Sequence, residues 1–303
     1  MPNTLCTPPK GKIANEDEDE DDEEEGGGAP KTFYHVVGTL SRADAVAPRW
    51  VKEVVDYDPT QKEALKDTLL GCQSVIWDIA TPDQVDGCSW AVEMLRDEME
   101  SFAENKLFLC ISSVLTWGKT RSADPEDAEA PILEEEYRRR RPHNRSKTHI
   151  DCEKLVIKCG RKTKGKFKTY VAASGLQYGA GEDVFHALFK SAWHQHPPAL
   201  PVFGPGTNVV PTIHVHDLAA LAINVIESQP ETKYLVAIDE SRSTLLELTT
   251  AIAEALGTRL APTPPLQLRL GLWLERTRMG GGGGGIAPPQ KPFSPRGGGV
   301  RAP

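Results

Sequence analysis

Short apolar runs and longer segments with a helical apolar stripe alternate along most of the chain. The runs of strand length occupy residues 33–40, 74–80, 106–112, 168–174, 209–215 and 233–238. The segments with helical spacing occupy residues 60–71, 81–103, 150–160, 183–194, 217–228 and 243–256. This alternation predicts an α/β fold, and the nearly continuous apolar character of 106–112 indicates a parallel sheet covered on both faces.

Polar residues at the expected helix ends support these boundaries. Thr60 precedes its helix with Glu63 three residues later, which is the spacing of a capping box. Ser243 or Thr244 can cap the last helix, with Glu247 close to the same spacing. These signals predict where the first and last helices begin.

Both ends of the chain depart from this pattern. Residues 16–25 are ten consecutive acidic residues, and without them the net charge of −8 would become +2. Such a block repels itself and buries no apolar area, so residues 1–30 are predicted to form a disordered acidic leader. A contact site for a basic partner is the alternative. Residues 263–303 are a low-complexity tail rich in glycine and proline, which leaves 31–262 as the predicted folded domain.

The cysteines and the hydropathy bear on the cellular compartment. The six cysteines form no Cys-x-x-Cys pair, and no basic segment followed by an apolar one marks the N-terminus as a secretion signal. We therefore expect reduced thiols in a cytoplasmic setting. No run of 18 apolar residues is present, so no membrane-spanning helix is expected.

The glycine-rich turns that bind phosphates are absent from the sequence. A dinucleotide-binding fold places Gly-x-Gly-x-x-Gly between its first strand and first helix, so that the backbone can approach the pyrophosphate. Gly26-Gly-Gly28 follows the acidic block rather than a strand and indicates a linker. No Gly-x-x-x-x-Gly-Lys-Ser/Thr loop occurs either. The fold is therefore expected to be incomplete at its N-terminus, without the first strand–helix unit.

Several motifs resemble those of the extended short-chain dehydrogenase/reductase family, which includes sugar-nucleotide epimerases. Leu107-Phe-Leu-Cys-Ile-Ser-Ser-Val-Leu-Thr-Trp-Gly118 is similar to the serine-containing strand of that family, and Gly175-Leu-Gln-Tyr-Gly179 is similar to its Tyr-Gly turn. The resemblance implies a doubly wound, mostly parallel, Rossmann-like sheet. It also places Ser113 at the position of the catalytic serine.

The same resemblance implies that the catalytic pair is degenerate. In active members a tyrosine exchanges the substrate proton, and a lysine four residues later lowers the pKa of that tyrosine. Here His149 stands at the tyrosine position and Glu153 at the lysine position. Lys154 is one residue out of register, which is a rotation of about 100° on a helix. Loss of dehydrogenase chemistry is expected.

A residual cofactor pocket would lie at the strand ends that line the cleft in such relatives. The residues expected there are Trp77, Asp78, Ala80, Ser113, Gly175 and Tyr178. Because the glycine turn and the catalytic pair are both missing, no cofactor is expected, and any binding of NAD(P) is expected to be weak. His214, His216 and Asp217 could form a metal site, but Asp217 is better explained as a helix cap, so no metal is expected.

Two basic segments could contact anions. Arg138–Arg141 could bind phosphate or an acidic partner, although a solvated surface is the simpler interpretation. Residues 161–168 add five basic residues without interleaved aromatic residues, so nucleic-acid binding has little support.

A more specific resemblance joins motifs across residues 31–262. They include Glu135-Glu-Tyr-Arg-Arg-Arg140, Pro198-Ala-Leu-Pro-Val-Phe-Gly204 and Tyr234-Leu-Val-Ala-Ile-Asp-Glu-Ser241. They resemble the N-terminal region of a long, cilium-associated member of the adenylate kinase family. That member carries a degenerate dehydrogenase-like domain ahead of its kinase domain.

This second resemblance implies a truncated chain that acts as a non-catalytic scaffold or partner-binding region. Its partners would be proteins, including axonemal ones, in the cytoplasm or cilium, and ATP would bind only the full-length form. A working NAD(P)-dependent epimerase or reductase is the rival interpretation. A kinase whose catalytic domain was lost from this sequence is a third.

Overall fold

A computed structural model describes the chain over residues 34–40, 51–56, 62–79, 82–122, 126–127, 132–181 and 184–260. The described residues up to 186 and from 207 to 248 form one compact unit, and those of 187–206 and 249–260 belong to a second. Both units lie within the predicted domain. The expected leader and tail, and Thr60 and Ala80, lie outside the described residues.

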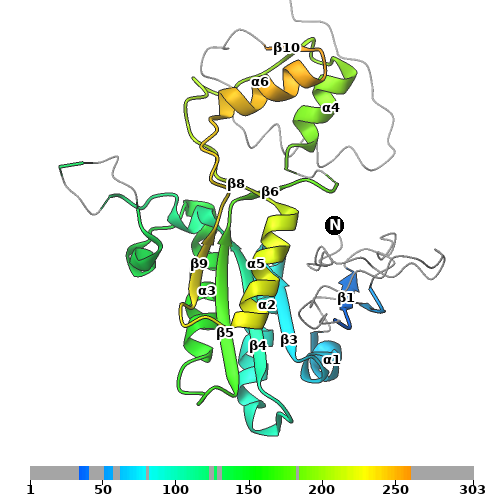
Figure 1. Ribbon diagram of the computed structural model, residues 1–303, viewed down its shortest axis with the longest axis vertical. Coiled ribbons are helices and arrows are strands. Elements are labelled where there is room, and N and C mark those ends of the chain that lie inside the picture. The colour runs from blue at the N-terminus through cyan, green and yellow to red at the C-terminus, as the bar shows by residue number, and fades with distance from the viewer. Residues whose placement is uncertain are drawn as a thin grey trace, which may run out of the picture. The chain divides into compact units, whose positions relative to one another are not determined.

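The first unit is built on four parallel strands in the order β3-β4-β5-β9 (Figure 1). These strands are β3 (Ser74–Asp78), β4 (Lys106–Ser113), β5 (Phe167–Ser174) and β9 (Tyr234–Ala237). Asp78 pairs with Ile111, and Ser113 pairs with Ser174. The carboxyl ends of β3, β4 and β5 therefore meet along one edge of the sheet.

Helices cover both faces of this sheet. Figure 1 shows α5 (Val215–Ser228) on one face, with α2 (Pro82–Asp97) and α3 (Lys147–Cys159) on the other. Side chains of β4 alternate between the two cores: Phe108 packs with residues of α2 and α3, and Leu109 packs with residues of α5. The α/β class and the doubly wound, mostly parallel sheet are thus confirmed.

A separate pair of parallel strands precedes the sheet. Strand β1 (Val37–Leu40) pairs with β2 (Glu53–Asp56), and neither strand pairs with β3 within the described residues. The chain then forms the 3-10 helix η1 (Lys62–Leu65) and helix α1 (Lys66–Gly71). Leu65 and Leu69 are buried, as their apolar stripe predicted.

The remaining elements are short. The 3-10 helices are η2 (Met99–Ser101), η3 (Val114–Trp117), η4 (Glu134–Arg139) and η5 (Asn144–Ser146). Strand β6 (Leu176–Tyr178) pairs with β8 (Thr212–His214), and β7 (Ala199–Leu200) pairs with β10 (Arg259–Leu260), both in parallel. The last two helices are α4 (His186–His194) and α6 (Leu245–Ala255).

The predicted cap of α6 is present, and the predicted cap of α5 is not. Before α6, the Thr244 N–H donates to Glu247 Oε2 (2.7 Å) and the Glu247 N–H donates to Thr244 Oγ1 (3.2 Å), so the capping box is confirmed. Asp217, however, lies within the first turn of α5 and does not cap it. His214 is the cap, because its Nδ1 accepts from the His216 N–H (3.2 Å).

Candidate cofactor and catalytic site at the carboxyl edge of the sheet

Three of the residues expected at a cofactor pocket lie at one edge of the sheet. Asp78 ends β3, Ser113 ends β4, and Gly175 directly follows β5. Ligands of open parallel sheets bind at the carboxyl ends of strands, so this is the edge where a dinucleotide would lie. Trp77 is buried, and its Nε1 donates to the Gln84 carbonyl (3.2 Å), so it supports α2 rather than this edge.

The serine that faces α3 is Ser112 rather than Ser113. Ser112 Oγ donates to Glu153 Oε1 (2.6 Å), whereas Ser113 Oγ accepts from the Leu115 N–H (3.2 Å) and caps η3. Successive side chains of a strand point to opposite faces, so both serines cannot face one helix. Ser113, which the resemblance puts at the position of the catalytic serine, therefore does not face the helix that carries His149 and Glu153; the preceding residue does.

The carboxylate at the lysine position is part of a buried ion pair. Glu153 is fully buried, and its Oε2 accepts from Arg140 Nε (2.9 Å) and Nη2 (2.5 Å). Burial raises the pKa of the Glu153 carboxyl, and Arg140 and then Ser112 oppose that rise. Arg140 is only 6% exposed while its neighbours in the arginine run are exposed, so this residue is no part of a solvated basic surface.

Aromatic rings complete the surroundings of this ion pair. Tyr137 stacks on Tyr234 with ring centroids 4.9 Å apart, and the Arg140 guanidinium lies 4.6 Å from the centre of the Tyr234 ring. Trp117 donates its Nε1–H to Tyr234 Oη (2.8 Å). Burial raises the pKa of the Tyr234 hydroxyl. Segments far apart in sequence thus form one packed polar core.

Among the described residues, neither His149 nor Lys154 is hydrogen-bonded to Ser113. His149 lies one helical turn before Glu153 and is buried, and its ring contacts Thr148 Oγ1 at 3.5 Å. Lys154 is largely exposed and pairs with Asp151 (3.4 Å) on the outer side of α3. The helix therefore presents a carboxylate already bound by Arg140 where the resemblance would require an available ammonium group.

Tight packing marks the junction that follows β5. A Cβ on Gly175 would meet the Thr212 carbonyl carbon at 2.8 Å and the Pro211 carbonyl oxygen at 2.9 Å. Beyond it, Tyr178 packs edge-on against His214, with ring centroids 5.1 Å apart. His214 also uses Nδ1 as a helix cap, which agrees with a structural role for this histidine.

Three buried cysteine thiols form a cluster that the sequence does not predict. The sulfur atoms of Cys88, Cys110 and Cys152 all lie within 4.8 Å of one another, and those of Cys88 and Cys110 are 3.9 Å apart. They come from α2, β4 and α3, so no spacing in the sequence brings them together. Burial raises the pKa of the Cys88 thiol.

Comparison with solved structures identifies the class of fold. A putative epimerase from Burkholderia cenocepacia is 17% identical, with a TM-score of 0.60 over 77% of this chain and 76% of that chain. UDP-glucose 4-epimerase from Thermotoga maritima is 13% identical, with a TM-score of 0.58 over 77% and 79% of the two chains. The fold is therefore the Rossmann-like fold of epimerase-type proteins. No family model matches the chain.

Curated sequences give the more particular resemblance, which is to adenylate kinase 7. The mouse protein is 46% identical over 187 residues, which are 61% of this chain and 30% of the mouse protein. The protein of Macaca fascicularis is 56% identical over 108 residues, which are 36% of this chain and 20% of that protein. The chain thus matches less than a third of the length of either relative.

Among the described residues, none of the helices is both long enough and apolar enough to cross a membrane.

Proposed function

We propose that this chain is a non-catalytic, Rossmann-like scaffold or partner-binding region of an adenylate kinase 7-like protein. The full-length protein would transfer phosphate between nucleotides, converting ATP and AMP to two ADP. Its partners would be proteins in the cytoplasm and the cilium, including the axoneme. The observation that carries the proposal is the buried Arg140–Glu153 ion pair at the position where the dehydrogenase family has its lysine.

The ion pair supports loss of chemistry more strongly than the substitution alone. A carboxylate cannot lower the pKa of a neighbouring acid as an ammonium group does. Here both of its oxygens already accept hydrogen bonds, Oε1 from Ser112 and Oε2 from Arg140. Removing one partner of a buried pair costs about 3–5 kcal/mol, which explains why the site would persist as structure without catalysis.

The phosphate-binding side of the site supports the same proposal. The sequence has neither the dinucleotide glycine turn nor the phosphate loop of a kinase. Phosphoryl transfer needs such a cradle together with cations placed on the transferring group. Arg140, the buried member of the arginine run, is already bound to Glu153.

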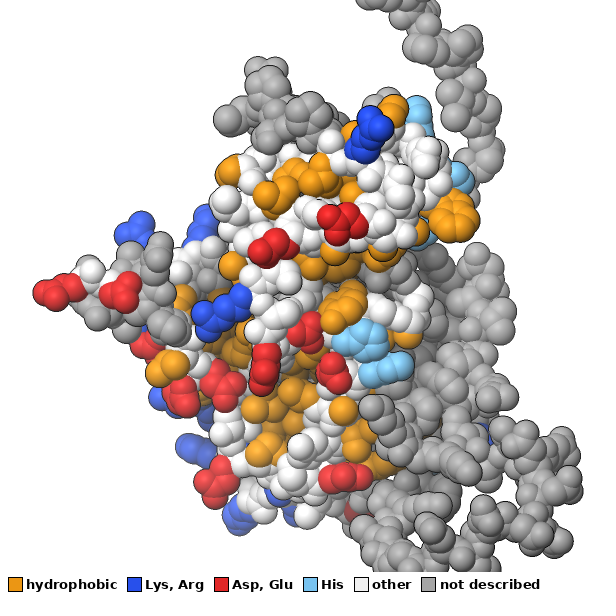
Figure 2. All heavy atoms as spheres, turned by 45° about the horizontal axis from the view of Figure 1, so that its top comes forward, with side chains coloured by type: hydrophobic (Ala, Val, Ile, Leu, Met, Phe, Trp, Pro, Cys, Tyr) orange, Lys and Arg blue, Asp and Glu red, His pale blue; other side chains and the backbone are white. Residues whose placement is uncertain are grey.

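The face of the molecule shown in Figure 2 supports a protein partner rather than a nucleic acid. Red acidic and blue basic side chains are interspersed over the face shown in Figure 2. A nucleic-acid site would concentrate basic residues on one face or along one helix.

Titration calorimetry with NADP tests the proposal directly. We expect no binding tighter than a dissociation constant of about 10 μM, which corresponds to roughly −7 kcal/mol. A tighter constant would mean that the pocket is functional and that the scaffold proposal is wrong. In a second assay, ATP and AMP with the purified 303-residue chain should give no ADP above background.

An NAD(P)-dependent epimerase or reductase is the second candidate. One of the similar structures is dTDP-glucose 4,6-dehydratase from Bacillus anthracis in complex with NAD, 14% identical with a TM-score of 0.53. The structural match covers 68% of this chain and 64% of the dehydratase chain. If this candidate were right, the fluorescence of NADPH would change when the chain is added. We expect it to stay unchanged.

A further inference from the structure

Three of the five described cysteines converge inside the first unit. Cys88 comes from α2, Cys110 from β4 and Cys152 from α3, and all three are buried. Their sulfur atoms all lie within 4.8 Å of one another, and those of Cys88 and Cys110 are 3.9 Å apart. Buried cysteines often pack as small apolar side chains. Here the three sulfurs gather around one point, so a single ion there would contact all of them.

The elements that carry these sulfurs hold them in place. Cys110 lies in the middle of the sheet, where its neighbours are Trp77 on β3 and Val171 on β5. Helices α2 and α3 cover the same face of the sheet (Figure 1), and Cys152 Sγ donates to the Val85 carbonyl of α2 (3.9 Å). The fold therefore builds the arrangement of the three thiols from its central strand and two packed helices.

The sulfur separations suit an ion with three sulfur ligands. With a metal–sulfur bond of about 2.3 Å, as in zinc–thiolate sites, an ion in the plane of three sulfurs holds them about 4.0 Å apart. The distance of 3.9 Å between the sulfurs of Cys88 and Cys110 agrees with this value. The other two separations are at most 4.8 Å, so binding requires movements of about 1 Å or less.

The ligand set selects the kind of ion. Thiolate sulfur is a soft ligand that favours Cu(I), zinc and iron–sulfur clusters. Structural zinc sites and iron–sulfur clusters take four protein ligands. Among the described residues, this group contains three sulfurs and no carboxylate or imidazole. Cu(I) is stable with three thiolates, and burial of the three side chains keeps water from the site.

We propose that Cys88, Cys110 and Cys152 bind one Cu(I) ion in a trigonal thiolate site. This site goes beyond the scaffold function and involves no nucleotide. Binding replaces three sulfur-bound protons with the ion, so the affinity rises with pH. Charged groups that act on the cluster include His149, whose charge favours the Cys152 thiolate, and Asp78, whose charge disfavours that of Cys88.

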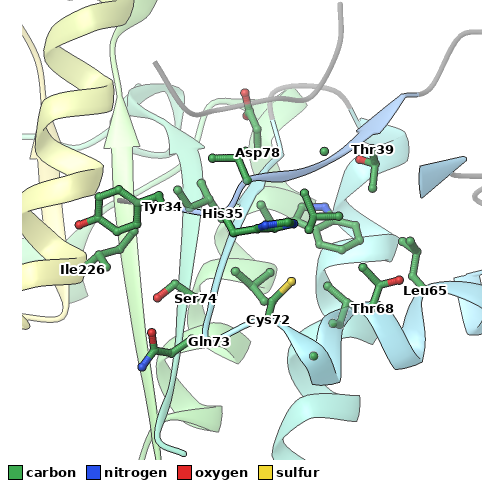
Figure 3. Close-up of a pocket in the computed structure, with 18 of the residues that line it drawn as sticks. Tyr34, His35, Thr39, Leu65, Thr68, Cys72, Gln73, Ser74, Asp78 and Ile226 are labelled. Atoms are coloured by element: carbon green, nitrogen blue, oxygen red, sulfur yellow. The ribbon is translucent and has the colours of Figure 1, made fainter. Parts of the chain in front are cut away.

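The other two described cysteines supply matched controls. Cys159 is buried on the same helix as Cys152 but does not belong to the cluster. Cys72 is half-buried and lines a cavity of about 530 Å³ that β1 and β3 border (Figure 3). A variant that lacks either of these two sulfurs therefore keeps the proposed site.

Competition with bicinchoninate, a chelator that forms a coloured complex with Cu(I), tests the proposal. The full 303-residue chain is unfolded, reduced and refolded with Cu(I) in the absence of oxygen, because the ligands meet only in the folded chain. We expect one copper ion per chain. Loss of a group that only orients a metal ligand costs about 10–100-fold in affinity, so Cys110→Ala should bind at least about 100-fold more weakly. Cys159→Ala and Cys72→Ala should bind as the original chain does.

Unfolding separates loss of the site from loss of the fold. Without copper, Cys110→Ala and Cys159→Ala should both show a cooperative urea transition, since each removes one buried sulfur. An ion that binds only the folded chain raises the midpoint of this transition, and Cu(I) should do so for Cys159→Ala but not for Cys110→Ala. X-ray absorption at the copper edge needs no variant, and in the original chain it should show three sulfur neighbours at about 2.3 Å.

Several outcomes would overturn the proposal. One is that the refolded chain retains no copper against the chelator. Another is that Cys110→Ala and Cys159→Ala bind copper equally well. Fewer than three sulfur neighbours around the copper would also contradict the site, and so would preferential binding of zinc, offered in the same way, with a nitrogen or oxygen ligand. None of these readouts uses NADP or ATP, so they decide this inference separately from the scaffold proposal.

Discussion

The carboxyl edge around α3 and the edge of β3 that faces β1 are two regions of one unit. They differ in how their polar groups are paired. At the first, Arg140, Ser112 and Glu153 satisfy one another in a fully buried network. At the second, Ser74 and Ile76 border a cavity with backbone groups that lack a strand partner among the described residues. The buried polar groups of the first region bond to one another, whereas the backbone groups at the second face a cavity.

The largest effect is expected from a substitution that removes one partner of the buried Arg140–Glu153 ion pair. Arg140→Ala should lower the free energy of unfolding by about 3–5 kcal/mol, because Glu153 would be left buried and unpaired. Arg139→Ala is the matched control from the same run, since its salt bridge with Glu136 is largely exposed and should contribute less than about 1 kcal/mol. Urea denaturation of both variants measures the difference. Equal effects would mean that the buried pair does not hold this region together.

A second prediction asks how tightly the strand ends are packed. Gly175→Ala should lower the free energy of unfolding by about 1–3 kcal/mol, because its Cβ would overlap the backbone of Pro211 and Thr212. Gly71→Ala is the control, since nothing lies within 4 Å of a Cβ there. Thermal unfolding of the two variants compares them. A tolerated Gly175→Ala would show that the edge can open enough to admit a ligand.

A third prediction concerns a local signal that lies outside both regions. Thr244→Ala should lower the free energy of unfolding by about 1 kcal/mol, because the Glu247 N–H loses its side-chain acceptor. Denaturant unfolding measures the loss. Thr244→Ser keeps the hydroxyl and should restore most of the stability; if it does not, the capping box is not the cause.

The smallest expected effect belongs to the edge of β3 that faces β1. The Ser74 N–H points away from β4, so Ser74→Pro should change the free energy of unfolding by about 0.5 kcal/mol or less, as substitutions away from bonded groups do. Val75→Pro is its counterpart one residue on, and it should cost about 3 kcal/mol because it places a proline within the β3–β4 ladder. Similar losses for the two variants would show that both edges of β3 are paired.

Hydrophobic periodicity predicts each strand of the main sheet and each α-helix. It does not predict strands β2, β6, β7 and β10, which have two to four residues each. For the expected cofactor residues, the strand pattern predicts the positions of Asp78, Ser113 and Gly175, which lie at the end of a strand or directly after one. The choice between Ser112 and Ser113 could not be predicted, because it depends on which face of β4 receives α3.

The sequence by itself determined the α/β class, the missing glycine turn and the carboxylate at the lysine position, since each is a matter of period or residue type. Only the tertiary structure decided that Arg140 leaves an otherwise exposed arginine run to pair with Glu153, and that Cys88, Cys110 and Cys152 meet in one core. It alone also placed β1 beside β3 with a cavity between them. The physical reason is that these contacts join segments distant in the chain, and their energies depend on burial and direction, which no local pattern specifies.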